Sequence, residues 1–182
     1  PARLLQRQFS DKLQCEVVIS GETVDTWRNE VEVATRGVVV LQTQSLLRNS
    51  VRLLQLFEAV QLRRPLVCVN VEGGGYDFAK VKPLLHSLPN ELPLGEMVTL
   101  QNELKAIGCG IGQLASSLSD AVPNAISVFF NPAAGDKMME AAIRDILQKL
   151  ERVDELLTSQ SIGVNNVAAV ITVSASEEEP PM

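Results

Sequence analysis

The chain has 182 residues, a length typical of a single globular domain. Hydrophobic residues make up 46% of it and charged residues 21%, so it can bury enough apolar surface to fold and is not predicted to be a disordered protein. No apolar run is long enough to cross a bilayer, and the N-terminus lacks the pattern of a signal peptide, so membrane insertion is not expected. Sixteen basic and 22 acidic residues give a net charge of −6 without a basic stripe, which argues against nucleic acid as a partner.

The cysteine and histidine content limits the kinds of disulfide, catalytic and metal sites that the chain can form. Cys15, Cys68 and Cys109 are odd in number and far apart, which is typical of a reducing, cytoplasmic compartment rather than of a disulfide framework. His86 is the only histidine, so any catalytic triad or zinc site would have to be built around this one imidazole. It stands between prolines and leucines and is interpreted as structural, and no metal site is expected.

The N-terminal quarter alternates between helix and strand. Apolar residues at four-residue spacing predict an amphipathic helix over 1–14, and a β-branched run predicts a strand over 15–20. A second helix is expected over 27–35, ended by Gly37, and a second strand over 38–43.

The same alternation continues through the middle of the chain. Ser50 is a candidate cap for a helix over 51–62, and an apolar run predicts a strand over 66–71. Residues 72–122 contain three consecutive glycines and several prolines, and the pattern there predicts at least one helix, near 97–107.

Order returns in the C-terminal third. A strand is predicted over 125–130, and apolar residues at three- and four-residue steps predict a long helix from Asp136 to 157. Residues 1–157 thus form the predicted domain. Residues 158–176 are interpreted as a linker that contains a further strand candidate at 167–174, and the acidic, proline-containing segment 177–182 as a disordered tail.

The order of these elements predicts the fold class. Strands that are apolar along their whole length are typical of parallel strands covered on both faces. We therefore expect an α/β protein with a three-layer, flavodoxin-like arrangement: a mainly parallel sheet with helices on both faces. In such folds a ligand crevice lies at the carboxyl ends of the strands.

Two stretches resemble a TIR domain, the signalling module of Toll and interleukin receptors. In residues 27–71 an acidic helix leads into the strand Val-Val-Val-Leu-Gln, followed by a serine-containing loop, the helix Leu-Leu-Gln-Leu-Phe-Glu-Ala-Val and the strand segment Arg-Arg-Pro-Leu-Val-Cys-Val-Asn-Val. The run Ile-Ser-Val-Phe-Phe-Asn-Pro before a long helix is similar to the last strand of that family. The resemblance covers about residues 4–157 and implies a cytoplasmic signalling module. Its expected partners are other copies of itself, with which it would form a homo-oligomer, or other TIR-like domains.

The resemblance also implies an alternative, enzymatic function. TIR domains that cleave NAD use a glutamate on the helix that matches 51–62, where the residue is Glu58. By this resemblance Glu58 would be the catalytic carboxylate of an NAD⁺ glycohydrolase, with NAD⁺ as substrate and no other cofactor. A fixed negative charge in a dry pocket stabilises the positive charge that develops on the ribose as nicotinamide departs. The other interpretation of Glu58 is an ion pair at the rim of its helix.

One departure from the family generates a structural hypothesis. The family has a strand before the helix that opens this chain, and this strand lies inside the sheet. Something should occupy its place, because unpaired backbone groups in a sheet are costly. We expect the segment 167–174 to do so, either within the chain or in a neighbouring molecule; the alternative is that it opens a second, tandem domain.

Other motifs fail the context that their chemistry requires. Gly73-Gly74-Gly75 follows a strand, but no Lys-Ser or Lys-Thr completes a phosphate-binding loop, so a flexible loop is expected. The glycines at 108, 110 and 112 follow a predicted helix instead of a strand. A receiver domain would need an aspartate where the second strand ends, and Gln42 and Thr43 stand there.

Overall fold

The computed structural model describes residues 2–13, 17–19, 27–33, 37–125, 127–158 and 169–172. The linker expected after residue 158, the tail expected at 177–182 and Cys15 lie outside these residues. Among the described residues, no helix combines the length and the apolar character needed to cross a bilayer.

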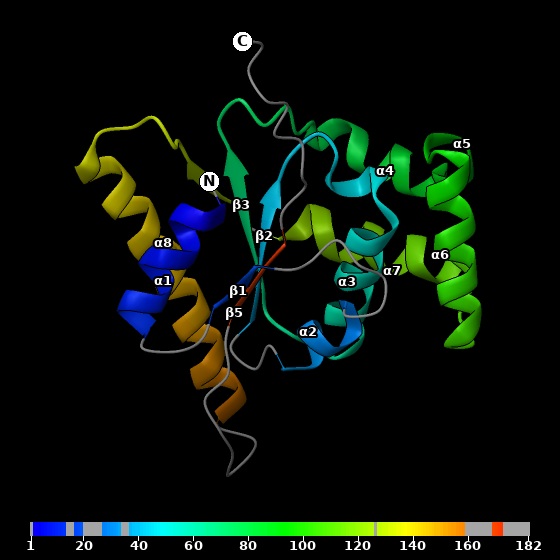
Figure 1. The fold of residues 1–182 in the computed structure, drawn as a ribbon, viewed down its shortest axis with the longest axis horizontal. Helices are drawn as coiled ribbons and strands as arrows, with labels where there is room; N and C mark the ends of the chain where they lie inside the picture. Colours follow the sequence, from blue (N-terminus) through cyan, green and yellow to red (C-terminus); the bar gives the residue numbers. More distant parts are fainter. Residues whose placement is uncertain are drawn as a thin grey trace.

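A parallel sheet forms the centre of the fold (Figure 1). Its strand order is β1-β5-β2-β3-β4, and every neighbouring pair is parallel. The strands are β1 (Val18–Ile19), β2 (Gly37–Gln42), β3 (Leu66–Val71), β4 (Ser127–Phe130) and β5 (Ala169–Thr172). The α/β class and the flavodoxin-like arrangement expected from the sequence are both present.

The last strand of the chain lies inside the sheet. In β5, Val170 is opposite Val18 of β1 on one side and Val38 of β2 on the other. The strand expected at 167–174 is therefore present over Ala169–Thr172, in parallel orientation and within the same chain. The resulting order is that of a flavodoxin-like sheet in which β5 takes the position that the first strand has in that fold.

Helices α1 (Ala2–Leu13) and α8 (Asp136–Thr158) cover one face of the sheet (Figure 1). The side chains that face them alternate along β2, β3 and β4, as the two-residue period of a strand requires. The apolar spacing predicted for the long helix holds where its side chains are described. Buried on this side are Leu5, Phe9, Val39, Leu41, Val67, Val69, Phe130, Ile143, Ile146 and Leu150.

The opposite face is covered by α2 (Trp27–Val33), α3 (Ser50–Gln61), α4 (Phe78–His86) and α7 (Ile111–Asn124). Two further helices, α5 (Leu88–Glu91) and α6 (Leu94–Ala106), lie outside this layer. Because α6 packs on α3, residues on almost every side of α3 are buried, including the polar Arg52 and Gln55. The molecule thus has the three expected layers with an additional helical layer on one side.

The additional layer falls in the stretch where the sequence predicted at least one helix. That helix is α6, which begins at Leu94, three residues before its expected start, and the structure adds α4, α5 and α7 around it. Prolines in or beside these helices obscure their pattern in the sequence. Pro83 lies inside α4, Pro89 opens α5 and Pro93 caps α6.

Two predicted helix boundaries are corrected by the structure. Asn49, and not Ser50, caps α3, since its side chain accepts a hydrogen bond from the Arg52 amide at 3.0 Å. Gly37 begins β2 instead of ending the preceding helix, and its φ is +143°. A Cβ at this position would lie 2.9 Å from the Pro65 carbonyl oxygen, so only glycine fits where the two chain segments cross.

Candidate functional site

A cavity of about 120 Å³ lies at the carboxyl ends of β2 and β3. It is enclosed by the segment after β2, by the short helix η1 (Leu46–Arg48), by the segment after β3 and by the first two turns of α4. At this end of the sheet, where the strands terminate, a flavodoxin-like fold places its ligands, as expected from the sequence. We therefore take this cavity as the candidate site.

Backbone hydrogen bonds hold the two loops of the cavity together. The Gln44 amide donates to the Gly74 carbonyl at 2.7 Å, and the Gly74 amide donates to the Val71 carbonyl at 2.9 Å. Gly73 and Gly75 have φ values of +76° and +67°, a conformation that glycine adopts at little cost. The three consecutive glycines thus build a hydrogen-bonded turn that forms one wall of the cavity.

The inner wall of the cavity is apolar. Leu47 of η1 and Val81 of α4 line it, together with Leu84 and the ring of Tyr76. The Tyr76 ring also meets Phe78 edge to face, with the two centroids 4.9 Å apart. Phe78 does not line the cavity, and its contact supports the Tyr76 ring from outside.

A buried polar group of three residues adjoins this wall. Gln42 at the end of β2 is fully buried, and Cys68 of β3 is 1% exposed. Burial raises the pKa of Cys68 to about 11. Burial also raises the pKa of Tyr76, as does the nearby Cys68, while an interaction with the Gln42 side chain opposes the shift. These groups are uncharged at neutral pH, so neither the thiol nor the phenol is an activated nucleophile there.

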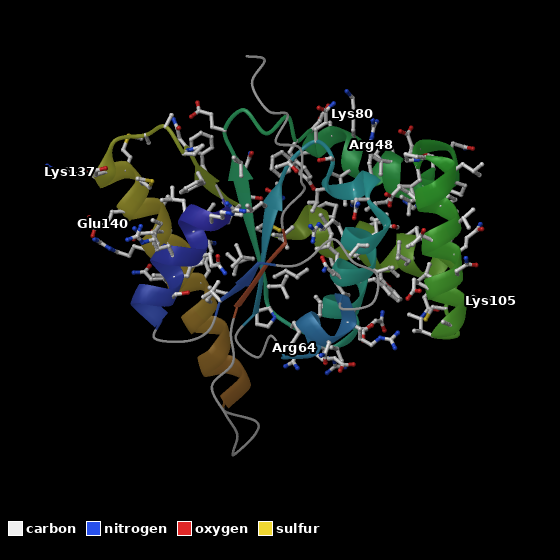
Figure 2. All side chains as sticks on the ribbon, viewed as in Figure 1. Arg48, Arg64, Lys80, Lys105, Lys137 and Glu140 are labelled. Atoms are coloured by element: carbon white, nitrogen blue, oxygen red, sulfur yellow. The ribbon has the colours of Figure 1, made fainter. Side chains whose placement is uncertain are left out.

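Charged side chains surround the mouth of the cavity. Lys80 Nζ lies 3.1 Å from Asp77 Oδ2, and Arg48 Nη2 lies 3.4 Å from Glu91 Oε2. The hydrogen bond from Lys80 lowers the pKa of Asp77, whose Oδ1 also accepts the Ala79 amide and caps α4. Figure 2 shows Arg48 and Lys80 at the same end of the molecule, above the carboxyl ends of β2 and β3. Each of the two cations at the mouth is therefore paired with a carboxylate.

Glu58, the catalytic candidate from the sequence, lies away from this cavity. It belongs to the third turn of α3, about 12 Å along the helix from Ser50 at a rise of about 1.5 Å per residue. Because α3 starts at the carboxyl end of β2 and runs back along the sheet, its last turns lie near the amino ends of the strands. Arg64, which follows α3, is labelled at that opposite end in Figure 2.

The contacts of Glu58 are those of a packed helix rim. Its side chain is 14% exposed, and Oε1 lies 3.9 Å from Nε of Arg28, which comes from the first turn of α2. Arg64 joins the same two helices, since its Nη2 donates to the Glu32 carbonyl at 2.8 Å. Both contacts tie α2 to α3, and the residues that line the cavity do not include Glu58.

The remaining candidates occupy surface or connecting positions. His86 is exposed in the last turn of α4, where a cation is favoured by the helix dipole. Gly108 and Gly110 lie between α6 and α7, and Gly112 lies in the first turn of α7, so these glycines follow a helix, as expected. Within the described ranges, no three His, Cys, Asp or Glu side chains are grouped so as to hold a metal ion.

Comparisons of the chain with protein-family models, with curated proteins and with solved structures found no match. The functional argument therefore depends on the fold and on its surfaces. The sequence singled out neither Arg48 nor Lys80. The available signal was their position after two strands whose carboxyl ends meet at one edge.

Proposed function

We propose that this chain is a TIR-like interaction module that acts by self-association, and that two copies meet along the free edge of β4. The observation that supports the proposal is the exposed edge of this strand. β4 is the last strand in the sheet order, so one of its edges has no neighbouring strand among the described residues. Phe129 on this strand is 57% exposed, although large aromatic side chains are usually buried.

The backbone of β4 presents hydrogen-bonding groups at this edge. The Phe130 carbonyl accepts the Glu72 amide at 2.9 Å, so Phe130 points its backbone groups toward β3. Successive residues of a strand point their backbone groups to opposite sides, and the N–H and C=O of Phe129 therefore point away from β3. Groups of this kind are a template for pairing with another strand.

A second copy of the chain is a suitable partner for this edge. The strand reads Ser-Val-Phe-Phe and carries no charge and no proline, the two features that most often prevent edge pairing. Two such edges can pair antiparallel across a twofold axis, where the same surface serves both copies. The exposed Phe129 rings would then be brought together and lose their contact with water.

The experiment that tests this proposal is sedimentation of the purified chain over a range of concentrations. We expect a reversible dimer, and we expect Phe129→Lys to shift it to monomer because a lysine at the edge opposes pairing. The matched control is Leu94→Lys, which places the same charge at an 82% exposed apolar position on α6, and which should leave the dimer intact. A chain that stays monomeric at all concentrations, or a dimer that Leu94→Lys disrupts and Phe129→Lys does not, would overturn the proposal.

Hydrolysis of NAD⁺ by Glu58 stays a separate prediction. The low exposure of the Glu58 carboxylate is compatible with a desolvated charge, but the Arg28 guanidinium lies beside it and partly neutralises it. Assembled protein incubated with NAD⁺ provides the test: release of nicotinamide that is lost in Glu58→Gln supports the enzymatic function. Absence of turnover, or turnover that Glu58→Gln retains, excludes Glu58 as the catalytic carboxylate.

A further inference from the structure

We propose that the cavity at the carboxyl ends of β2 and β3 binds a small organic anion, whose apolar part enters between η1 and α4 and whose charge meets Arg48. The cavity lies at the opposite end of the strands from Glu58, and the self-association proposal does not depend on the cavity. The two proposals can therefore succeed or fail independently.

The size and lining of the cavity fit a single ring or a short branched chain. Its volume is about 120 Å³, and a cavity of roughly 150 Å³ lined by apolar side chains accommodates benzene. Leu47 and Val81 offer aliphatic contacts on two sides, and the Tyr76 ring offers a flat face. A ligand body of this size would displace water from all three.

The charges at the mouth favour an anion over a cation. Both oxygens of Asp77 are already occupied, one by the Ala79 amide and the other by Lys80. The Arg48 guanidinium has five donors, and in the described part of the chain it meets only Glu91, at 3.4 Å and half exposed. Exposed pairs of this kind contribute little, so Arg48 can exchange Glu91 for a ligand carboxylate or phosphate at low cost.

Benzoate is a suitable probe, because it combines one ring with one carboxylate. We expect its titration into the ¹⁵N-labelled chain to shift the amide resonances of Gly75, Gln44 and Leu84, with a dissociation constant on the order of 1 mM, as is usual for a ligand of this size. Benzamide, which has the same shape without the charge, should bind about tenfold more weakly, and the cation benzamidine should bind least.

Two variants test the role of Arg48. Arg48→Gln should weaken benzoate about tenfold and leave benzamide unchanged, whereas Lys82→Gln, an exposed cation of α4 outside the cavity, should change neither. Equal binding of benzoate and benzamide, an equal loss of benzoate binding in Arg48→Gln and Lys82→Gln, or no shift at 20-fold the expected dissociation constant would overturn the proposal.

Discussion

The backbone amide of Ser50 donates a hydrogen bond of 2.6 Å to the carboxylate of Glu96. Ser50 is the first residue of α3 and Glu96 lies in the first turn of α6, 46 positions away in the sequence. The carboxylate therefore satisfies one of the free amides at the start of α3 and is stabilised there by the helix dipole. This contact fastens the additional helical layer to the central helix.

The substitution Glu96→Ala is expected to lower the free energy of unfolding by about 1 to 2 kcal/mol, because it leaves a partly buried amide without an acceptor. Glu96→Gln keeps an acceptor oxygen and removes only the charge, so its effect should be less than half as large. Urea unfolding measures both, with Glu72→Gln in an exposed loop as the control for the loss of one negative charge. Equal stability of all three variants would show that the contact contributes nothing.

The position of β5 predicts slow hydrogen exchange near the C-terminus. Because β5 pairs on both sides, with β1 and with β2, its amides belong to ladder hydrogen bonds inside the sheet. Residues 170–172 should exchange on the timescale of the amides of β2, and Val170→Pro should destabilise the chain by about 1 to 3 kcal/mol because it removes a ladder hydrogen bond. Rapid exchange of residues 170–172 in the intact chain would contradict the insertion of this strand.

The end of α3 predicts a stabilising substitution. Arg63 has a φ of +53°, and the Arg64 amide donates to the Ala59 carbonyl at 2.7 Å, which is the geometry of a Schellman motif. Glycine is the residue that this position favours, because a side chain in the left-handed conformation is strained. Arg63→Gly should raise the thermal midpoint and increase the free energy of unfolding by about 1 kcal/mol. Arg63→Ala should raise neither. A lower midpoint for the glycine variant would contradict this account of the helix end.

Stability should fall at alkaline pH because of Cys68. Burial raises its pKa to about 11 in the folded chain, above the value near 9 for an exposed thiol. The unfolded state therefore loses its proton first, so the stabilisation is complete below about pH 8 and declines by about 2 kcal/mol as the pH rises to 11. Denaturant unfolding across this range should show the decline, and Cys68→Ala should make it shallower where Cys109→Ala, at a partly exposed position, does not; the buried phenol of Tyr76, whose pKa is also raised, accounts for the rest near pH 11. Equal slopes in both variants would contradict the assignment.

The sequence predicted those parts of the fold that depend on local pattern. The apolar runs 38–43 and 66–71 predicted parallel strands in a sheet covered on both faces. The structure has β2 and β3 there, and their ends differ from the predicted ends by at most one residue. The insertion of the last strand was expected from the resemblance to TIR domains, in which a strand occupies this inner position of the sheet, and the resemblance left open whether the same chain would supply it. Pattern and topology together were sufficient for the class of fold.

The parts that depend on contacts between distant segments could not be predicted in this way. Between β3 and β4, α4 and α7 each contain a proline and α5 has only four residues. These helices are stabilised by packing on α3 and on one another and by the Glu96 contact. The cavity is formed by two loops that meet only because their strands are neighbours. Glu58 was selected by its position on one helix, and its closeness to Arg28 depends on how α2 packs on α3.

Hydrogen exchange at Phe129 as a function of protein concentration tests the central claim, that two copies meet along β4, most directly. The Phe129 amide points away from β3, so in the monomer it should exchange rapidly. We predict that its exchange slows at least tenfold between a concentration at which the chain is monomeric and one at which it is dimeric, while the amides at the start of α6 do not change. An unchanged rate at Phe129 in a chain that sediments as a dimer would contradict the account.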